Sequence, residues 1–224
     1  MSTSGLKLIG IHGGTFDPVH LGHVALAEAA EQELKLDQVL WMPSGTPGHR
    51  GAPVASAPQR LAMLELAVAG HPRWRIDAAE LQGKEQTYTI NTLARLRRQL
   101  GKEQPLVVLL GTDSFLTLPD WKRWEELFDL AHFAIANRPG FLPGIGSTPA
   151  DLAAQMASRA DRRDRFGASP AGKIVSFDMP QLDISASGIR AAIAAGTAPR
   201  DLLASAVLAY IESNQLYRKE PSSN

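Results

Sequence analysis

Short apolar runs alternate with longer segments of helical periodicity along most of the chain. Runs of about five apolar residues predict buried strands, and apolar residues recurring at three and four positions predict helices. The predicted strands cover residues 7–11, 38–42, 74–78, 106–110, 132–136 and 173–177. The predicted helices cover residues 20–34, 57–69, 90–100, 121–130, 150–163, 187–195 and 201–213.

This alternation is typical of an α/β fold with a mostly parallel sheet. We expect a Rossmann-like, doubly wound sheet with helices on both faces and a small helical C-terminal part over about residues 185–218. The length of 224 residues suits a single domain over residues 1–218, and residues 219–224 are expected to form a flexible tail. Ligands of such sheets bind beyond the carboxyl ends of the strands, so polar residues that follow the strands are candidates for chemistry.

Composition narrows the class of protein. Lysine and arginine total 23, and aspartate and glutamate also total 23, so the formal net charge is zero and neither a nucleic acid nor a membrane is the expected partner. The absence of cysteine excludes disulfides and thiolate chemistry. The N-terminus shows no basic-then-apolar signal, and no apolar run is long enough to span a bilayer. These features predict a cytoplasmic enzyme, either a monomer or a homo-oligomer.

The most informative segment lies between the first predicted strand and the first predicted helix. Residues 13–23 read Gly-Gly-Thr-Phe-Asp-Pro-Val-His-Leu-Gly-His. Gly13 and Gly14 let the backbone approach a ligand closely, and a helix N-terminus attracts phosphate. The spacing of His20 and His23 places both imidazoles on one helix face, where they can donate hydrogen bonds to phosphate because imidazole titrates near neutral pH. No cysteine or nearby acid completes a zinc site, so no metal ligand is assigned.

The turn inside this segment carries signals of its own. Asp17-Pro18 is a typical turn initiator, so we expect Asp17 to order the loop rather than to take part in chemistry. Thr15 offers a hydroxyl and a backbone N–H to a ligand.

The run over residues 13–23 resembles the signature of the nucleotidyltransferase superfamily that carries an H-x-G-H motif. Within it, the doubled glycine is similar to bacterial nicotinate-nucleotide adenylyltransferases, which join nicotinate mononucleotide to the AMP part of ATP and release pyrophosphate. Weaker motifs extend the resemblance along nearly the whole chain. They lie at residues 42–50, 87–92, 111–113, 118–121, 137–140 and 184–190.

The resemblance implies three groups of site residues. The expected catalytic residues are His20, His23 and Arg190. The expected ATP-binding residues are Gly13, Gly14, Thr15, Phe16, His20, His23, Gly111, Asp113, Ile184, Ser185, Ser187 and Arg190. The expected residues for nicotinate mononucleotide are Ser44, Arg50, Thr87, Tyr88, Trp121 and Arg138.

The last motif departs from the family pattern I-S-S-T-x-I-R. Ala186 replaces the second serine and Ser187 replaces the threonine. Because Ser187 keeps a hydroxyl and Arg190 is retained, we expect phosphate binding to survive.

The chemistry that the resemblance implies needs no strong general base, because the attacking phosphate oxygen is already ionised at neutral pH. Catalysis then rests on positioning and on charge neutralisation at the α-phosphorus. Mg²⁺ is the implied cofactor, held mainly by the ATP phosphates. Backbone N–H groups over residues 87–89 are candidates to select the nicotinate carboxylate. Trp121 is expected to stack on the pyridine ring, and the plainer interpretation of Trp121 is a packed core residue.

Other functions stay open. Pantetheine-phosphate adenylyltransferases and cytidylyltransferases share the G-T-F-D and H-x-G-H core but usually lack the doubled glycine together with L-P-x-W and R-P-G. The acceptor can also be nicotinamide mononucleotide, alone or beside the nicotinate substrate. A non-catalytic nucleotide-binding regulator is a third alternative, against which the retention of His20, His23 and Arg190 argues.

Overall fold

The computed structural model describes residues 6–47, 52–83, 86–137, 148–163, 166–180 and 182–219. Its centre is a six-stranded parallel sheet in the order β4-β2-β1-β6-β7-β8. The strands are β1 (Ile9–Gly14), β2 (Gln38–Pro43), β4 (Trp74–Ile76), β6 (Leu106–Gly111), β7 (His132–Asn137) and β8 (Ile174–Asp178). The predicted α/β fold with a doubly wound parallel sheet is confirmed.

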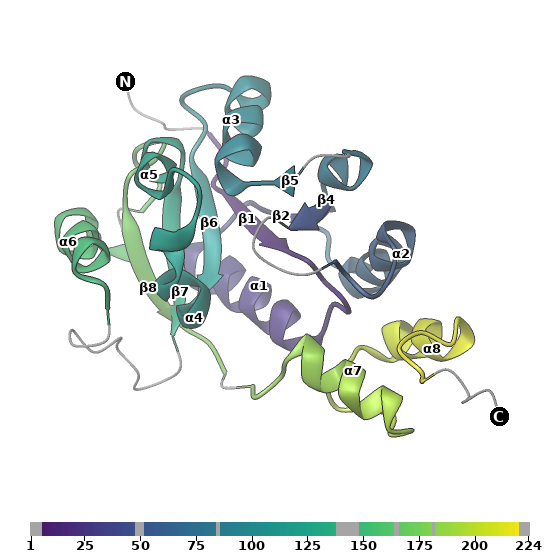
Figure 1. The fold of residues 1–224 in the computed structure, drawn as a ribbon. Coiled ribbons are helices and arrows are strands. Elements are labelled where there is room, and N and C mark those ends of the chain that lie inside the picture. Colours follow the sequence, from purple (N-terminus) through teal and green to yellow (C-terminus); the bar gives the residue numbers. More distant parts are fainter. Residues whose placement is uncertain are drawn as a thin grey trace.

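Helices cover both faces of this sheet (Figure 1). One face is covered by α1 (Leu21–Leu34), α2 (Ala57–Val68), α7 (Ala186–Ala194) and α8 (Ser205–Ser213), which share a hydrophobic cluster. The other face is covered by α3 (Thr89–Leu100), α4 (Thr112–Leu116), α5 (Leu127–Leu130) and α6 (Ala150–Arg159). Within the described residues, no helix combines the length and the apolar character that crossing a membrane requires.

The uninterrupted apolar sequence of β6 follows from this double cover. Val107 and Leu109 pack into the cluster of one face, whereas Val108 and Leu110 pack into the cluster of the other. Successive side chains of a strand point to opposite faces, so a strand buried on both faces needs apolar residues throughout.

The winding of the sheet changes direction between β1 and β6. The first half of the chain builds outward from β1 through β2 to β4, and the second half builds from β6 through β7 to β8. Ligands of doubly wound sheets bind at this switch point, outside the carboxyl ends of the strands. Gly13 and Gly14 end β1 and Gly111 ends β6, so they lie on the two sides of it.

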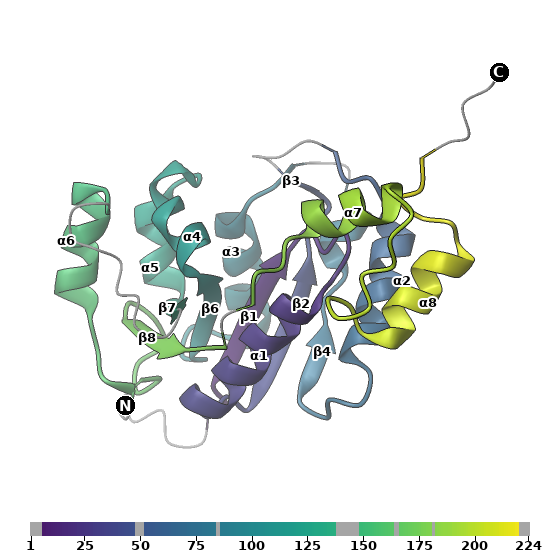
Figure 2. The ribbon, with the colours of Figure 1, turned by 90° about the horizontal axis from the view of Figure 1, so that it is seen from below.

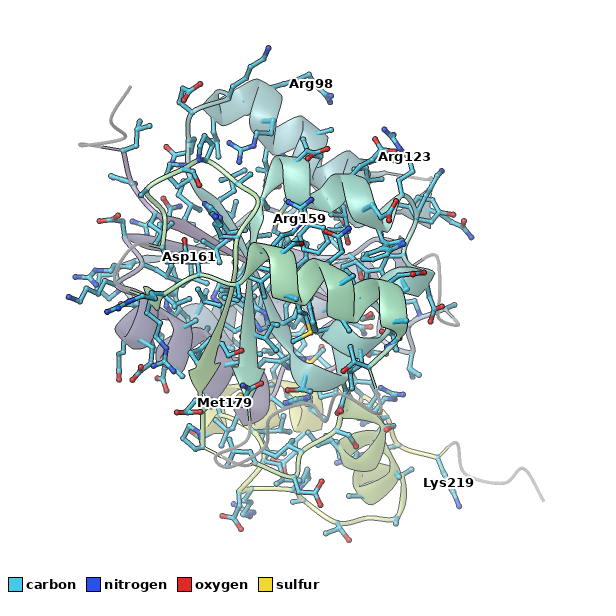
Figure 3. The ribbon with its side chains drawn as sticks, turned by 90° about the vertical axis from the view of Figure 1, so that its left-hand side faces the viewer. Arg98, Arg123, Arg159, Asp161, Met179 and Lys219 are labelled. Carbon is cyan, nitrogen blue, oxygen red and sulfur yellow. The ribbon has the colours of Figure 1, made fainter. Side chains whose placement is uncertain are left out.

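Three predicted helices are shorter than the periodicity indicated. The segment predicted as a helix over 121–130 contains only the 3-10 turn η3 (Trp124–Glu126) and α5, because Arg123 (Figure 3) has a φ of 55° in the left-handed region. α6 ends at Arg159 because Ala160 forms a bridge to the start of β8. α8 begins only at Ser205, after the Leu202 carbonyl has accepted a hydrogen bond from the first residue of α1.

Several small elements were not predicted. A two-stranded sheet pairs β3 (Thr46–Pro47) with β5 (Gln86–Thr87), and one-turn helices form at η1 (Ala79–Gln82), α4 and η2 (Leu118–Asp120). These elements have at most five residues, too few for the hydrophobic pattern to repeat, so periodicity cannot reveal them. The predicted flexible tail lies outside the described residues except for Lys219.

The C-terminal helices fold back onto the first part of the chain. Figure 2 shows α8 beside α2, and α7 near the end of β1. Beyond α8, the hydroxyl of Tyr217 donates a 2.7 Å hydrogen bond to the Asp17 carboxylate, 200 residues away in sequence. Burial of this contact raises the pKa of Tyr217, so the hydroxyl keeps its proton.

We expect Tyr217→Phe to lower the free energy of unfolding by about 1.5–3 kcal/mol, because a buried carboxylate loses one charge-assisted hydrogen bond. Urea unfolding monitored by circular dichroism measures this difference. Tyr210→Phe is the matched control, since the Tyr210 hydroxyl makes no hydrogen bond within the described residues. An equal loss in both variants would contradict the anchoring role of Tyr217.

Candidate active site

Asp17 orders the loop between β1 and α1. Its carboxylate accepts hydrogen bonds from the backbone N–H groups of Val54 and Ala55, at 2.7 and 3.0 Å, in addition to the Tyr217 hydroxyl. The carboxylate is buried. All of these contacts hold other segments of the chain in place, which confirms that Asp17 organises the loop.

His20 and His23 lie together at the start of α1. Their rings stack with centroids 3.7 Å apart, so the prediction that they share one face is confirmed. The helix begins at Leu21, which makes His20 the N-cap residue. The backbone N–H of His20 donates to Nδ1 of His23 at 3.3 Å, so a neutral His23 carries its proton on Nε2.

The surroundings of Gly22 explain why this position of the H-x-G-H motif is a glycine. A Cβ atom at this position would lie 3.1 Å from Nδ1 of His20 and 3.7 Å from Cβ of Ile184. The first distance is tighter than an ordinary carbon contact. Glycine therefore leaves room for the His20 ring, whereas the distance to Ile184 would be an ordinary contact.

The His20 imidazole is neutral in the free protein. Burial lowers its pKa to about 4, and its Nδ1 has no hydrogen-bond partner among the described residues. The expectation of titration near neutral pH is therefore wrong for His20, because a low-polarity surrounding disfavours the imidazolium ion.

The C-terminal motif meets the loop of Asp17. Arg190 donates from Nη1 to the backbone carbonyl of Asp17 at 2.6 Å, and its guanidinium lies 3.9 Å from the Asp17 carboxylate. Ser185 is the N-cap of α7, where its Oγ accepts from the Gly188 N–H at 3.1 Å. The Ser187 hydroxyl donates to the same Oγ at 3.3 Å. Residues far apart in sequence, from the first and last motifs, are thus brought together.

The third predicted motif follows β6. Gly111 is the N-cap of α4, and Asp113 lies exposed in the first turn of that helix. The Thr112 hydroxyl donates to the Ala136 carbonyl at 3.0 Å, which ties this turn to β7. Because β6 pairs with β1, the turn lies at the same edge of the sheet as the glycine loop.

The residues expected to bind the mononucleotide come from three further segments. The Ser44 N–H donates to the Gly14 carbonyl at 2.9 Å, and the pairing of β3 with β5 brings Thr87 toward the same loop. Tyr88 is the N-cap of α3, and Lys122 lies with Nζ 4.4 Å from its ring centroid.

Trp121 precedes Lys122 in the chain and packs, half-buried, against the same apolar cluster as Tyr88. This packing agrees with the plainer interpretation of Trp121 and leaves part of its ring accessible. Arg50 and Arg138 lie outside the described residues.

Arg60 joins the two halves of the site, and the sequence analysis missed it. Nη1 donates to the carbonyls of Thr15 at 2.6 Å and Ser44 at 2.8 Å, and Nη2 donates to Gly45 at 3.3 Å. The residue is only 2% exposed. Its position in the sequence could have revealed it, because Arg60 lies three residues before Met63 on the buried face of α2. A cation in an apolar stripe indicates a bound anion or, as here, a set of carbonyls.

Unpartnered polar atoms gather at this edge of the sheet. Within the described residues, both ring nitrogens of His12, Nδ1 of His20, Oγ of Ser44 and Nε of Arg60 are buried without a hydrogen bond. Buried polar groups are nearly always partnered, so a group of exceptions indicates a place where a ligand or water belongs.

The chain matches one family over most of its length. The family model described as Cytidylyltransferase-like matches residues 11–192. The chain therefore belongs to the cytidylyltransferase-like family.

Curated relatives refine this class. The chain is 48% identical over 212 residues to the probable nicotinate-nucleotide adenylyltransferase of Dechloromonas aromatica (strain RCB), covering 94% of this chain and 97% of the relative. It is 46% identical to the protein of the same name from Laribacter hongkongensis (strain HLHK9), covering 95% of each. Within its class, the chain belongs to the nicotinate-nucleotide adenylyltransferases, as the motifs indicated.

Solved structures agree in fold. A Plasmodium falciparum nicotinic acid mononucleotide adenylyltransferase complexed with NaAD superposes with a TM-score of 0.68 at 18% identity, covering 94% of this chain and 97% of that chain. A putative nicotinate-nucleotide adenylyltransferase from Vibrio parahaemolyticus gives a TM-score of 0.64 at 16% identity, covering 96% and 98%.

We expect acid to lower the stability of the protein already at pH values well above the pKa values of its carboxyl groups. The pKa values of His20 and His12 fall to about 4 and about 3 on folding, mainly through burial. Below pH 6.5 the unfolded chain therefore binds protons that the folded protein does not bind, and stability falls as the pH falls. Between pH 7 and pH 5 each imidazole should account for on the order of 1–2 kcal/mol.

Urea unfolding at the two pH values measures this loss. His20→Gln should be less sensitive to acid than the parent protein, because the glutamine side chain does not titrate. A stability that is the same at both pH values would contradict the burial of neutral imidazoles.

Proposed function

We propose that this protein transfers the adenylyl group of ATP to nicotinate mononucleotide, giving deamido-NAD and pyrophosphate in NAD biosynthesis. The observation that carries the proposal is that the stacked His20 and His23 rings follow the loop whose Asp17 carbonyl Arg190 holds, at the switch point of the sheet. The name shared by relatives that are 46% and 48% identical supports the choice of acceptor.

In this proposal the start of α1 binds the triphosphate. The first backbone N–H groups and the dipole of a helix favour an anion there. His23 and His20 donate hydrogen bonds to the transferring phosphoryl group and the pyrophosphate. Arg190 and the hydroxyls of Ser185 and Ser187 hold the remaining phosphates. Catalysis comes from positioning and charge neutralisation, and no residue has to act as a strong base.

Beside the phosphates, the adenosine part of ATP would bind along the glycine loop and the turn after β6. Gly13 and Gly14 admit close approach of the nucleotide, and Thr15 and Phe16 border it. Gly111 and Asp113 lie across the switch point, where Asp113 is free to reach a ribose or a bound water.

Nicotinate mononucleotide would bind beside Ser44, whose hydroxyl is unpartnered within the described chain. The N–H groups of Thr87 and Tyr88, at the start of α3, face the carboxylate in this proposal, and Trp121 stacks on the pyridine ring. Arg50 and Arg138 are assigned to the mononucleotide from the motif resemblance alone.

Mg²⁺ is the proposed cofactor. Among the residues that the structure describes, no three histidines, cysteines or acids form a group that could hold a metal ion. In this proposal the ion keeps several waters and is bound mainly by the ATP phosphates. The ion neutralises part of the phosphate charge. The chain itself contributes the N–H groups, imidazoles and guanidinium that bind the phosphates. Oligomeric state and a cytoplasmic location stay predictions.

Pyrophosphate release tests the proposed reaction. With ATP and Mg²⁺, we expect rapid release with nicotinate mononucleotide and slow or no release with nicotinamide mononucleotide or phosphopantetheine, because the carboxylate is the group that the site selects. Release only with another acceptor would overturn the substrate assignment and keep the phosphate site. No release with any acceptor, despite ATP binding, would favour a non-catalytic regulator.

Removing either histidine tests the catalytic assignment. We expect His23→Ala and His20→Ala each to lower kcat by about 10²–10³-fold, the usual effect of losing one donor to the transition state. Both variants should give the circular dichroism spectrum of a folded protein. His71→Ala is the control, since His71 stacks on Trp74 at the opposite end of the sheet. Similar losses in all three variants would argue against a specific role for the pair.

A further inference from the structure

His12 is a buried histidine that the proposed mechanism does not use. It lies in β1 just before the glycine pair and is 4% exposed. Its ring centroid lies 4.5 Å from that of Trp41, 5.5 Å from Phe16 and 5.8 Å from His23. Burial keeps the imidazole neutral, so it has one N–H donor and one acceptor nitrogen.

Neither of these nitrogens is hydrogen-bonded within the described residues, although the backbone of His23 is close enough to affect the His12 pKa. Burying an unpaired polar group is destabilising. A phenylalanine would fill the same space without this cost. The unpaired imidazole therefore has no structural advantage in the free protein.

His132 shows what this fold does with a buried imidazole that serves structure. It lies in β7 of the same sheet and is 0% exposed. Its Nδ1 accepts a hydrogen bond from the Lys173 N–H at 3.1 Å, and Nε2 donates to the Ser169 carbonyl at 2.7 Å. Away from the site both nitrogens of His132 are partnered, whereas beside the site neither nitrogen of His12 makes a hydrogen bond to the described part of the chain.

His23 is the polar ring nearest to His12 that faces the ligand in the proposed mechanism. At Nδ1 it accepts a weak hydrogen bond from the His20 backbone at 3.3 Å, which is longer than the usual range. A small rotation of the His23 ring would exchange this bond for one from the His12 imidazole. Nε2 of His23 would then keep its proton and point away from His12.

We propose that His12 is a positioning residue for His23, an inference that rests on the proposed function. When the triphosphate binds, His23 turns toward it, and the N–H of His12 donates to Nδ1 of His23. This contact fixes the His23 tautomer whose Nε2–H donates to the phosphate. No proton is transferred between the two rings.

The test compares free and ATP-bound protein. In the absence of ligand, His12→Phe should raise the melting temperature by about 2–4 °C, because an unpaired polar group is removed. The same variant should bind ATP with Mg²⁺ about fivefold more weakly, the effect of one ordinary hydrogen bond. Its kcat should fall by about tenfold, while KM for nicotinate mononucleotide stays unchanged. Calorimetry and pyrophosphate release measure these quantities.

Two further variants separate positioning from packing. His132→Phe should lower the melting temperature and leave ATP affinity unchanged, since its imidazole is partnered in the free protein. His12→Gln retains a donor and an acceptor and should recover part of the lost kcat.

Wild-type ATP affinity and kcat in His12→Phe would overturn the positioning role, as would a lower melting temperature of the free variant. A parent protein that does not bind ATP would overturn the proposed function and this inference together.

Discussion

The geometry of the site depends on the buried carboxylate of Asp17. One oxygen accepts from the Tyr217 hydroxyl and the Ala55 N–H, and the other from Val54, so the C-terminal end and the segment before α2 are both fastened to the loop after β1. The backbone carbonyl of Asp17 also accepts a hydrogen bond from Arg190. A single side chain thus sets the conformation between Gly14 and the histidines, and it fixes where the last motif meets the first. The loop owes its shape to distant parts of the chain rather than to its own sequence alone.

The charged groups around this loop have separate tasks. Nη1 and Nη2 of Arg60 donate to backbone carbonyls and hold the two strand ends together, whereas its buried Nε has no partner within the described residues. Arg190 is partly exposed and contacts Asp17, so its guanidinium is accessible to a ligand. Burial keeps His20 neutral in the free protein. In the proposed function, the negative charge of the bound triphosphate raises its pKa again.

Hydrophobic patterning predicts the elements whose burial is complete. β6 is apolar at every position because both faces are covered, and its predicted end differs from the observed one by a single residue. Periodicity fails where a local conformation decides, as at Arg123, whose left-handed backbone interrupts an otherwise helical pattern. It also fails for functional polar residues in apolar positions. Arg60 counts as a polar position of α2, and His12 lies just after the strand predicted over residues 7–11, although it falls inside β1. Only the tertiary structure shows what each one contacts.

His12 and His132 differ in whether the fold supplies hydrogen-bond partners to a buried polar side chain. A sheet covered on both faces has few positions where a polar side chain is tolerable, and for His132 at the start of β7 the cost is removed by two hydrogen bonds from the neighbouring segment. At the carboxyl end of β1 the two halves of the sheet diverge on either side of the switch point. The distant segments that meet there bond to Asp17 rather than to the His12 ring. Several buried polar atoms at this end, among them both ring nitrogens of His12 and the Ser44 hydroxyl, have no hydrogen-bond partner among the described residues. In the proposed function, a ligand supplies such a partner or causes one to form. The end of the sheet to which the proposal assigns the ligand is thus also the end at which these side chains are left unsatisfied in the free protein.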